Sequence, residues 1–291
     1  MGETTASIPT RVLVLGMTHD DGTIQAGELL PVAEACGQSA EQVRSCLRRL
    51  VSEGLFVRRG AGRTAEYVAT PRGMKALGGD LERTRIAYGQ DLHGRGWDGQ
   101  WRLVAVAVPE SRRAARDALR ERLRALGGAP IQGGLHVSPH DWHKDVHAAA
   151  ERLGVAEGLT LATTGELVVG GERDPRELAR NLWPVQELAT RYESFCRRYA
   201  PVLDLLQDMR SQHEHMPDTV FLPGALGMAV EYQECFREDP LLPPELLPRP
   251  WPGRTARELI LRTRRLALTL RTGAGRPALF RTYDDAIEAL R

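Results

Sequence analysis

Residues 39–69 join a capped amphipathic helix to a glycine-tipped β hairpin, and this order constrains the fold more than any other stretch of the chain. Ser39, followed three residues later by Gln42, matches a capping box, in which two side chains satisfy backbone amides at the start of a helix. Apolar residues then recur at helical spacing on one face: Val43, Cys46, Leu47, Leu50 and Val51. Two short β-type segments follow at residues 55–59 and 65–69, separated by a glycine-rich turn. The segment therefore predicts a helix that leads directly into a hairpin.

Two further apolar helices are expected upstream, at residues 11–17 and 26–35. Gly37 lies where glycine commonly ends a helix in the left-handed conformation. Two helices, a third helix with a polar face and a hairpin are typical, in this order, of a winged helix-turn-helix. In that fold the third helix enters the DNA major groove, and arginines at the hairpin tip neutralise phosphates or enter the minor groove. We therefore expect such a domain over residues 1–80, with double-stranded operator DNA as its partner.

Arginine is concentrated on the two elements that this fold presents to DNA. The candidate contacts on the helix are Gln42, Arg44, Ser45, Arg48 and Arg49, and those around the hairpin are Arg58, Arg59 and Arg63. The planar guanidinium suits bidentate binding of guanine and phosphate. Two alternatives stay open: the arginines only solvate a helix face, or the winged helix is an adaptor that binds protein partners.

The charge of the whole chain does not indicate nucleic-acid binding. Its net charge is +1, and of its 39 basic residues only Lys75 and Lys144 are lysine. A GC-rich genome accounts for most of this arginine bias. The local clusters, and not the composition, therefore carry the expectation of DNA binding.

Length and composition set outer limits on the class of protein. A chain of 291 residues predicts two or three domains. A hydrophobic fraction of 42% with no apolar run near the ~18 residues of a membrane span, and no signal-peptide pattern, predicts a cytoplasmic protein without membrane contact. The cysteines lie outside CxxC pairs and are expected to be reduced and buried, and no cofactor is expected: Cys36, Cys46, Cys196 and Cys235.

The middle of the chain has the pattern of a small α+β domain. Residues 77–96 are polar and contain glycine, which indicates a boundary, and we place a linker at residues 81–98. A central domain over residues 99–180 then alternates strands at 102–108, 131–138, 159–163 and 166–169 with helices at 111–126 and 142–153. This order approximates βαββαβ and predicts a ferredoxin-like fold.

The remainder, residues 181–291, is predicted to be a helical domain for dimerisation and effector binding. Helices are expected at residues 178–209, with a kink at Pro201, and at 220–237 and 255–270. The proline-rich stretch at residues 240–252 carries interleaved leucines and predicts an extended strap that packs on the helical domain or on a dimer partner. The fold class is therefore α+β, with a winged helix-turn-helix, a ferredoxin-like domain and a helical domain.

Several stretches of the chain, between about Thr10 and about Arg262, resemble the PaaX family of regulators. They are residues 43–51 with Gly54-Leu55; Trp97-Asp98-Gly99-Gln100-Trp101-Arg102-Leu103-Val104 with Val108-Pro109-Glu110 and Arg112-Arg113; residues 134–139; and residues 237–248 with 251–256. The resemblance implies a homodimeric repressor of an aromatic-acid catabolism operon, typically that for phenylacetate. It also implies release by an acyl-coenzyme A effector such as phenylacetyl-CoA.

Candidate effector-binding residues are four tryptophans and one arginine: Trp97, Trp101, Trp142, Trp183 and Arg102. An indole ring is a suitable wall for an aromatic acyl group, and an arginine attracts the phosphates of coenzyme A. The alternative is that the tryptophans anchor the core or a domain interface.

A histidine cluster and the central domain suggest two alternative functions. His136, His140, His143 and His147 fall within a dozen residues, and the last two have i, i+4 spacing, so a metal-responsive regulator is one alternative to ordinary solvated histidines. The PaaX central domain is similar to the small ferredoxin-like subunit of the CRISPR spacer-acquisition complex, which makes a metal-dependent nuclease the other. Ala107 occupies the position where an aspartate commonly ends the first strand, so we do not expect an enzyme.

Overall fold

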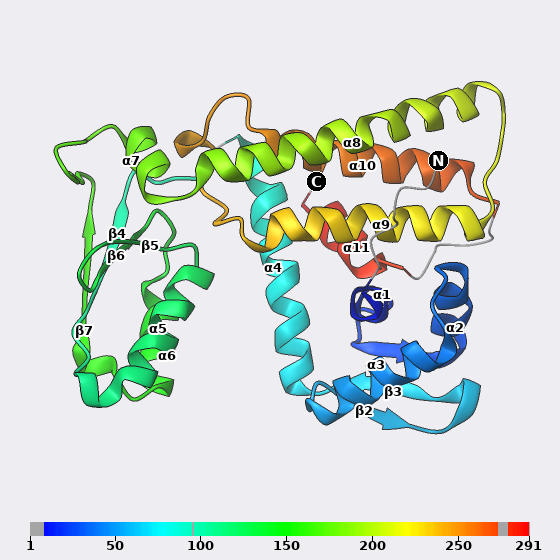
Figure 1. The fold of residues 1–291 in the computed structure, drawn as a ribbon, viewed down its shortest axis with the longest axis horizontal. Helices are drawn as coiled ribbons and strands as arrows, with labels where there is room; N and C mark the ends of the chain where they lie inside the picture. Colours follow the sequence, from blue (N-terminus) through cyan, green and yellow to red (C-terminus); the bar gives the residue numbers. More distant parts are fainter. Residues whose placement is uncertain (1–8, 95, 273–278, 291) are drawn as a thin grey trace. The chain divides into compact units, whose positions relative to one another are not determined.

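The computed structural model describes residues 9–94, 96–272 and 279–290, without the side chains of residues 63, 79 and 80. Helices predominate, and two small sheets accompany them, which confirms the α+β class (Figure 1). The chain divides into two compact units. Unit 1 comprises residues 1–89, 194–234 and 255–291, and unit 2 comprises residues 90–193 and 235–254. No helix in the described part of the chain is both long and apolar enough to cross a membrane.

The first part of unit 1 contains three helices and a three-stranded antiparallel sheet. Its elements are α1 (Thr10–Gly16), β1 (Thr23–Gln25), α2 (Ala26–Ala35), α3 (Ala40–Ser52), β2 (Phe56–Arg59), the short helix η1 (Gly62–Thr64) and β3 (Glu66–Ala69). The strand order is β1-β3-β2. The three predicted helices and the predicted hairpin are all present, whereas β1 was not predicted because three residues are too few for a periodic pattern.

Helix α4 (Pro71–His93) runs through most of the segment that was predicted to be a boundary and linker. The predicted linker is helical over residues 81–93, and the two units divide within it, between Gly89 and Gln90. Gly78 and Gly89 lie within the helix, with open space where a Cβ would stand. Glycine lowers helix propensity by about 1 kcal/mol relative to alanine, which a long helix tolerates.

Unit 1 is completed by helices from the second half of the chain. They are the later part of α8 (Val185–Ser211), most of α9 (Asp218–Arg237), α10 (Pro252–Leu270) and α11 (Arg281–Glu288). Leu13 of α1 and Leu47 of α3 belong to the same buried cluster as Leu226, Leu270 and Leu279. Residues 1–80 therefore share one core with residues more than a hundred positions further along the chain.

The start of α11 is fastened to the end of α1. The amide of Phe280 donates to the carbonyl of Gly16 at 2.7 Å, and the Thr282 hydroxyl donates to the carbonyl of Thr18 at 2.8 Å. Gly16 permits this approach because an added Cβ would lie 2.6 Å from the Phe280 ring. The absence of a side chain at Gly16 thus allows the close contact between the two elements.

Unit 2 contains a four-stranded antiparallel sheet with the strand order β5-β6-β4-β7. The elements run β4 (Trp101–Val106), α5 (Arg113–Ala125), β5 (Ala129–Gln132), β6 (Leu135–Ser138), α6 (His143–Arg152) and β7 (Leu159–Thr164). Helices α5 and α6 and strands β4 and β7 lie close to their predicted positions, and the strand region predicted at residues 131–138 is divided into β5 and β6. The predicted strand at residues 166–169 is absent: Val169 makes only an isolated bridge to Glu172. The Thr164 hydroxyl donates to the carbonyl of Glu166 at 2.7 Å, and this local turn ends β7.

Helices α5 and α6 share a core with one face of the sheet. Leu119 and Leu123 of α5 and Val146 of α6 are fully buried with Val104 and Val106 of β4. The even-numbered positions of β4 therefore face the helices, and the odd-numbered positions, which include Trp101, face the other side.

The predicted helix at residues 178–209 is two helices, α7 (Pro175–Leu182) and α8, with Trp183 and Pro184 between them. Proline lacks the amide needed to continue the helical hydrogen bonds. The predicted strap after α9 packs within unit 2 and buries its leucines: Leu241, Leu242, Leu246 and Leu247. The Gln90 side chain donates to the carbonyl of Leu241 at 3.0 Å, and the Arg176 side chain donates to that of Glu245 at 2.9 Å.

Candidate nucleic-acid interface

Helix α3 separates a buried apolar face from an exposed polar face. Val43, Cys46, Leu47 and Leu50 are buried in the core of unit 1. The capping box is confirmed: the Ser39 hydroxyl accepts from the Gln42 amide at 3.2 Å, and the Gln42 side-chain oxygen accepts from the Ser39 amide at 2.7 Å. The cap fixes the start of the helix, and the buried face fixes its rotation.

Glu41 gathers two arginines on the polar face of α3. Its carboxylate accepts from Arg44 at 3.1 Å and from Arg48 at 2.8 Å, and all three side chains are exposed. These hydrogen bonds lower the pKa of Glu41 below its ordinary value. Glu41 was not predicted to be a site residue, although its i, i+3 and i, i+7 spacing to Arg44 and Arg48 indicates this cluster.

The Gln42 side chain is held in the capping box at the start of α3. Adenine recognition by glutamine uses the side-chain oxygen and nitrogen together, and the capping box occupies that oxygen. Ser45 is half-buried, and Arg49 is exposed near the end of the helix. The exposed cationic groups of α3 are therefore Arg44, Arg48 and Arg49.

The β2–β3 hairpin carries its arginines on an edge strand. Arg58 and Arg59 are exposed on β2, and their Cα partners on β3 are Tyr67 and Glu66. Consecutive strand residues face opposite sides, so the two guanidinium groups leave different faces of the hairpin. Arg63 falls in η1 at the tip, and its side chain lies outside the described residues.

Two glycines shape the tip of this hairpin. Gly60 and Gly62 have φ values of 71° and 60°, a left-handed conformation that glycine adopts at little cost. The Thr64 hydroxyl closes the turn by donating to the carbonyl of Ala61 at 3.0 Å. The tip is thus a compact turn that comes directly after the exposed Arg58 and Arg59 in the chain.

Three of the candidate effector-binding tryptophans come together in unit 2. The ring centroids of Trp97 and Trp101 lie 5.0 Å apart, and those of Trp101 and Trp183 lie 6.3 Å apart. The Trp183 indole donates to the carbonyl of Gly127 at 3.0 Å, and the Trp97 indole donates to that of Gln100 at 2.9 Å. Trp101 and Trp183 are buried, and Trp97 is half-buried.

Trp142 stands apart from this stack. It is buried in the core between the sheet and helices α5 and α6, whereas Trp101 faces the opposite side of the sheet. A Cβ on Gly128 would lie 2.2 Å from the Trp142 ring, so the helix end and the indole are in close contact. The four predicted tryptophans therefore do not line one site.

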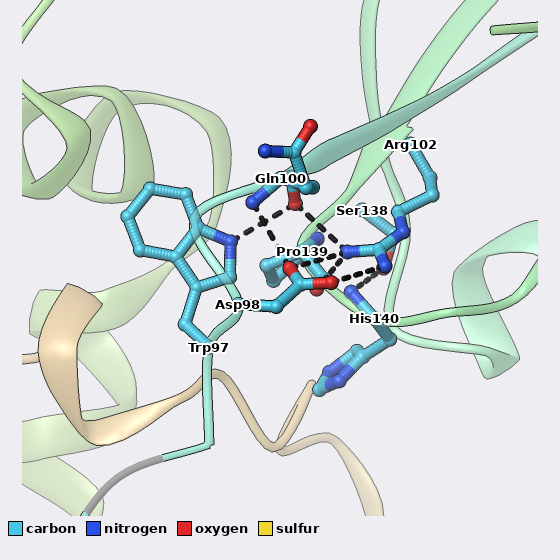
Figure 2. A network of polar contacts seen from close by, with 7 residues as sticks. All are labelled: Trp97, Asp98, Gln100, Arg102, Ser138, Pro139 and His140. Atoms are coloured by element: carbon cyan, nitrogen blue, oxygen red, sulfur yellow. Dashed lines mark hydrogen bonds and ion pairs between the residues drawn. The ribbon is translucent and has the colours of Figure 1, made fainter. Parts of the chain in front are cut away.

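Arg102 is bound into a polar network that also includes Trp97, the half-buried member of the tryptophan stack (Figure 2). Its guanidinium pairs with the Asp98 carboxylate and donates to the carbonyl of Gln100 at 3.1 Å and to that of Pro139 at 3.5 Å. The pairing lowers the pKa of Asp98 and raises that of Arg102. Only 12% of the Arg102 side chain is exposed, and its hydrogen bonds hold the Trp97–Trp101 loop against the end of β6.

The histidines do not assemble into a metal-binding set. Among the described residues, no three His, Cys, Asp or Glu side chains gather as ligands. His140 bonds to the carbonyl of Pro240 at 3.0 Å, and His147 lies 3.6 Å from Glu151. His136 is buried, its Nδ1 lies 3.1 Å from the carbonyl of Gly134, and burial lowers its pKa. His143 is half-buried on the first turn of α6.

The end of β4 offers no carboxylate for nuclease chemistry. Ala107 follows the strand directly, and its amide donates to the carbonyl of Gly158 at 2.8 Å. The next acidic residue, Glu110, pairs with Arg116 at 2.7 Å. No disulfide joins the four cysteines, all of them among the described residues; Cys36, Cys46 and Cys235 are buried, as predicted, whereas Cys196 is half-buried. Burial raises the pKa of Cys36 to about 11.

Three family models match successive parts of the chain. The model described as PaaX-like protein matches residues 4–73, the PaaX protein central Cas2-like domain matches residues 94–179, and the PaaX-like protein C-terminal domain matches residues 183–274. Together they leave unmatched only short stretches between residues 4 and 274.

The chain is also similar to two individual proteins. The chain is 27% identical over 245 residues to the transcriptional repressor PaaX of Escherichia coli (strain K12), an alignment that covers 84% of this chain and 74% of that protein. It is also similar in structure to the uncharacterized protein Rv0674 from Mycobacterium tuberculosis, with a TM-score of 0.55, 22% identity, and 98% and 99% of the two chains covered. The second likeness shows a shared fold. The chain belongs to the PaaX family of transcriptional regulators.

Proposed function

We propose that this protein is a ligand-responsive transcriptional repressor that binds operator DNA through α3 and the β2–β3 hairpin. The observation that carries the proposal is the pair Arg44 and Arg48, held on the exposed face of a capped helix whose other face is buried. A regulator family that includes a transcriptional repressor supports it.

The first part of unit 1 is, in this proposal, a winged helix-turn-helix. Three helices and an antiparallel sheet, with a glycine-tipped hairpin as the wing, support this assignment. Helix α3 is then the recognition helix that enters the major groove. Arg44, Arg48 and Arg49, with Ser45, contact DNA from α3, and Gln42 acts through the helix cap.

The hairpin arginines contact the DNA backbone in the same proposal. Arg58 and Arg59 lie on the strand that enters the tip, and Arg63 lies at the tip in the sequence. Phosphate contacts of this kind set affinity and orientation, whereas base contacts set sequence preference.

The central region of unit 2 is proposed to be a ferredoxin-like domain. Its βαββαβ order, with the first and third strands adjacent at the centre of an antiparallel sheet, supports that assignment. We propose that the central and C-terminal regions form a homodimer and bind the effector. An acyl-CoA such as phenylacetyl-CoA, acting on an aromatic-acid operon, is the effector that the family resemblance implies.

The regulatory step requires two states of the protein. An effector that binds better to the state with misplaced recognition helices lowers DNA affinity by its coupling free energy. The Trp97–Trp101–Trp183 stack is the region that we propose for effector contact, because three aromatic rings gather there, and Arg102, which is paired with Asp98, positions the Trp97–Trp101 loop.

A mobility-shift assay on the upstream region of the gene tests the proposal. The wild-type protein is expected to shift this DNA, and one compound of an acyl-CoA panel is expected to release it. Replacing Arg48 and Arg63 by alanine together should abolish the shift, while Arg85→Ala on α4 should leave it intact. Unchanged binding by the double variant would refute the site, and no shift of any upstream fragment by the wild type would favour an adaptor for protein partners.

A further inference from the structure

Helix α11 lies beyond the residues that the three family models match, because the last of those matches ends at residue 274. It belongs to unit 1, and Figure 1 shows it beside the end of α1. The proposed recognition helix α3 belongs to the same unit. The family models therefore give α11 no role, although it reaches the helices around α3.

The helix itself buries little of its surface. Of its eight residues, all of which the structure describes, only Ala286 is buried. A helix this short is not stable alone in water, so it forms only where other contacts hold it. Leu279, two residues before α11, is fully buried in the core of unit 1. The attachment of α11 therefore depends on the residues at its start.

The start of α11 packs against the end of α1. The Phe280 amide donates to the Gly16 carbonyl at 2.7 Å, and the Thr282 hydroxyl donates to the Thr18 carbonyl at 2.8 Å. Carbonyls at the end of a helix have no partner within that helix, and these two bonds satisfy one such group and one just beyond it. A Cβ on Gly16 would lie 2.6 Å from the Phe280 ring and 3.2 Å from the Leu279 side chain. The two elements are therefore in direct contact.

Helix α1 in turn supports α3. Leu13 and Val14 of α1 are fully buried in the same cluster as Leu50 of α3, and the two helices pack on each other. The Arg11 side chain also pairs with Glu53, the residue that follows α3, at 2.9 Å. A shift of α1 would therefore change the support beneath α3. Direct contacts thus run from α11 through α1 to the proposed recognition helix.

Arg264 fastens the start of α11 to α10. Its Nε and Nη2 each lie 2.6 Å from one oxygen of the Asp284 carboxylate, and Nη2 also donates to the Leu279 carbonyl at 2.9 Å. The guanidinium carbon lies 6.0 Å from the centroid of the Phe280 ring. Only 13% of the Arg264 side chain and 16% of the Asp284 side chain are exposed, so salt screens this bidentate pair less than a surface pair. One arginine therefore holds the three residues that position α11.

Two features of this joint are unfavourable by themselves. Phe280 has a φ of 61°, in the left-handed region that non-glycine residues rarely occupy. The Thr18 hydroxyl is buried and has no hydrogen-bond partner among the described residues. Such features persist only where surrounding contacts impose them. The Arg264–Asp284 pair and the buried Leu279 supply those contacts, so loss of the pair favours an open joint.

We propose that residues 279–288 form a clamp that positions the recognition helix, and that the Arg264–Asp284 pair closes it. With the clamp closed, α1 has a fixed place and α3 rests on it. With the clamp open, α3 keeps its own hydrogen bonds and its arginines, but its orientation is no longer fixed. Base contacts need hydrogen-bond geometry, whereas attraction to phosphates acts over a longer range. The clamp therefore sets the preference for operator DNA, and this inference rests on the proposed function because it assumes that α3 reads DNA.

Asp284→Asn tests the clamp because the electrostatic effect of the substitution has the opposite sign. Removing an anion from the protein should by itself strengthen DNA binding. If the clamp positions α3, Asp284→Asn should instead weaken operator binding ~3- to 10-fold and change binding to random DNA by less than ~2-fold. Glu288→Gln is the matched control, because it removes the same charge from an exposed position of the same helix and should not weaken operator binding. Fluorescence anisotropy titrations with both DNAs measure these affinities.

Two further variants separate the clamp from a change in folding. Asp284→Glu keeps a carboxylate for Arg264 and should recover most of the operator affinity. Thr282→Val removes the hydroxyl bond to Thr18 without a change of charge, so it should weaken operator binding by a smaller factor than Asp284→Asn. Circular dichroism should be the same for wild type and all four variants. If Asp284→Asn does not fold, an unchanged operator preference in Thr282→Val contradicts the clamp.

Hydrogen exchange of the full chain reports on the clamp in the absence of DNA. In Asp284→Asn the amides of α1 and α3 should exchange ~3- to 10-fold faster than in wild type, because their support opens locally. The amides of β4 and β6 in unit 2 should exchange as in wild type. Equal acceleration in both units would mean a general loss of stability and would overturn the clamp.

The clamp and the repressor proposal fail separately. A wild type that retains no upstream DNA, together with faster exchange in α3 of Asp284→Asn, contradicts the repressor and supports the clamp. Equal operator binding by wild type and folded Asp284→Asn contradicts the clamp and supports the repressor. Stronger binding of both DNAs by Asp284→Asn, matched by Glu288→Gln, would mean that only the charge of residue 284 matters, which also overturns the clamp.

Discussion

The carboxylate of Glu41 holds the guanidinium of Arg48 at 2.8 Å across two turns of the proposed recognition helix. Arg44 binds the same carboxylate from the intervening turn. The acidic group thus occupies the place that a DNA phosphate or an acceptor on a base edge would take. DNA binding at this face requires the two arginines to exchange one anion for another.

Replacing Glu41 by glutamine should therefore strengthen non-specific binding. We expect Glu41→Gln to bind random duplex DNA ~3- to 10-fold more tightly at low salt, and the gain should shrink as salt rises. Fluorescence anisotropy titrations at several salt concentrations measure this. Glu53→Gln is the matched control, because Glu53 pairs with Arg11 outside the proposed face. An equal gain in both variants would mean that net charge alone is responsible.

Arg58 and Arg59 should behave as phosphate contacts. Alanine at either position should weaken binding to operator DNA and to random DNA by the same factor. Each phosphate contact that is lost should reduce the slope of log binding constant against log salt concentration by about one. The same titrations give both values. A loss confined to operator DNA would instead assign the hairpin to base recognition.

Arg48 should differ from the hairpin arginines. If Arg48 contacts a base, Arg48→Ala should weaken the binding free energy for operator DNA by about 1–3 kcal/mol and that for random DNA by less. The preference for the operator over random DNA should therefore fall. Arg85→Ala on α4, which removes an exposed arginine paired with Glu82, should change neither affinity. Equal losses on both DNAs would make Arg48 a phosphate contact.

His136 should make stability depend on pH. Burial among the helices and sheet lowers its pKa below the ordinary ~6.5, so the unfolded chain takes up a proton at higher pH than the folded chain. The contribution of neutral His136 to the free energy of unfolding is complete above about pH 6.5 and is lost as the pH falls through the lowered pKa. Urea unfolding between these limits should show a shallower decline for His136→Gln than for wild type. His147→Gln, at an exposed position, should decline as wild type does.

Gly16→Ala should loosen the attachment of α11 to α1. The added methyl would lie 2.6 Å from the Phe280 ring, and overpacking of this kind costs about 1–3 kcal/mol. Gly78→Ala, in an open part of α4, should instead stabilise the protein by about 0.5–1 kcal/mol. Denaturant unfolding compares the two variants. Combining Gly16→Ala with Phe280→Leu should recover part of the loss, and strict additivity would argue against direct contact.

Local patterns predicted much of the fold. The bounds of α2, the capping box of α3 and the succession of elements in unit 2 all follow from turn residues and apolar spacing over short windows. The missed elements were those for which a local pattern misleads. The glycines of α4 led to the prediction of a linker in place of a helix, and Pro184 divides the predicted long helix into α7 and α8. A short strand such as β1 depends on its neighbour β3 more than on its own sequence.

The candidate site was less predictable, because its chemistry depends on which side chains meet. Gln42 fits both a cap and a base contact in the sequence, and only the geometry shows its oxygen in the cap. Glu41 gains its importance from two arginines on later turns. Trp142 and Trp101 look equivalent in the sequence, but Trp101 lies on the face of β4 that points away from α5 and α6, whereas Trp142, at the start of α6, is buried in the core between those helices and the sheet.

The shared core of unit 1 has a consequence for the biosynthesis of this protein. The ribosome delivers α1, α2 and α3 first, yet the buried cluster that supports them includes Leu226, Leu270 and Leu279, which emerge much later. Domains usually fold as units during synthesis, from the N-terminal end. Here α3, the proposed recognition helix, stays incompletely supported until translation has passed residue 279. A nascent chain halted before that point lacks part of this core, so we expect the proposed recognition helix to gain its full support only near the end of synthesis.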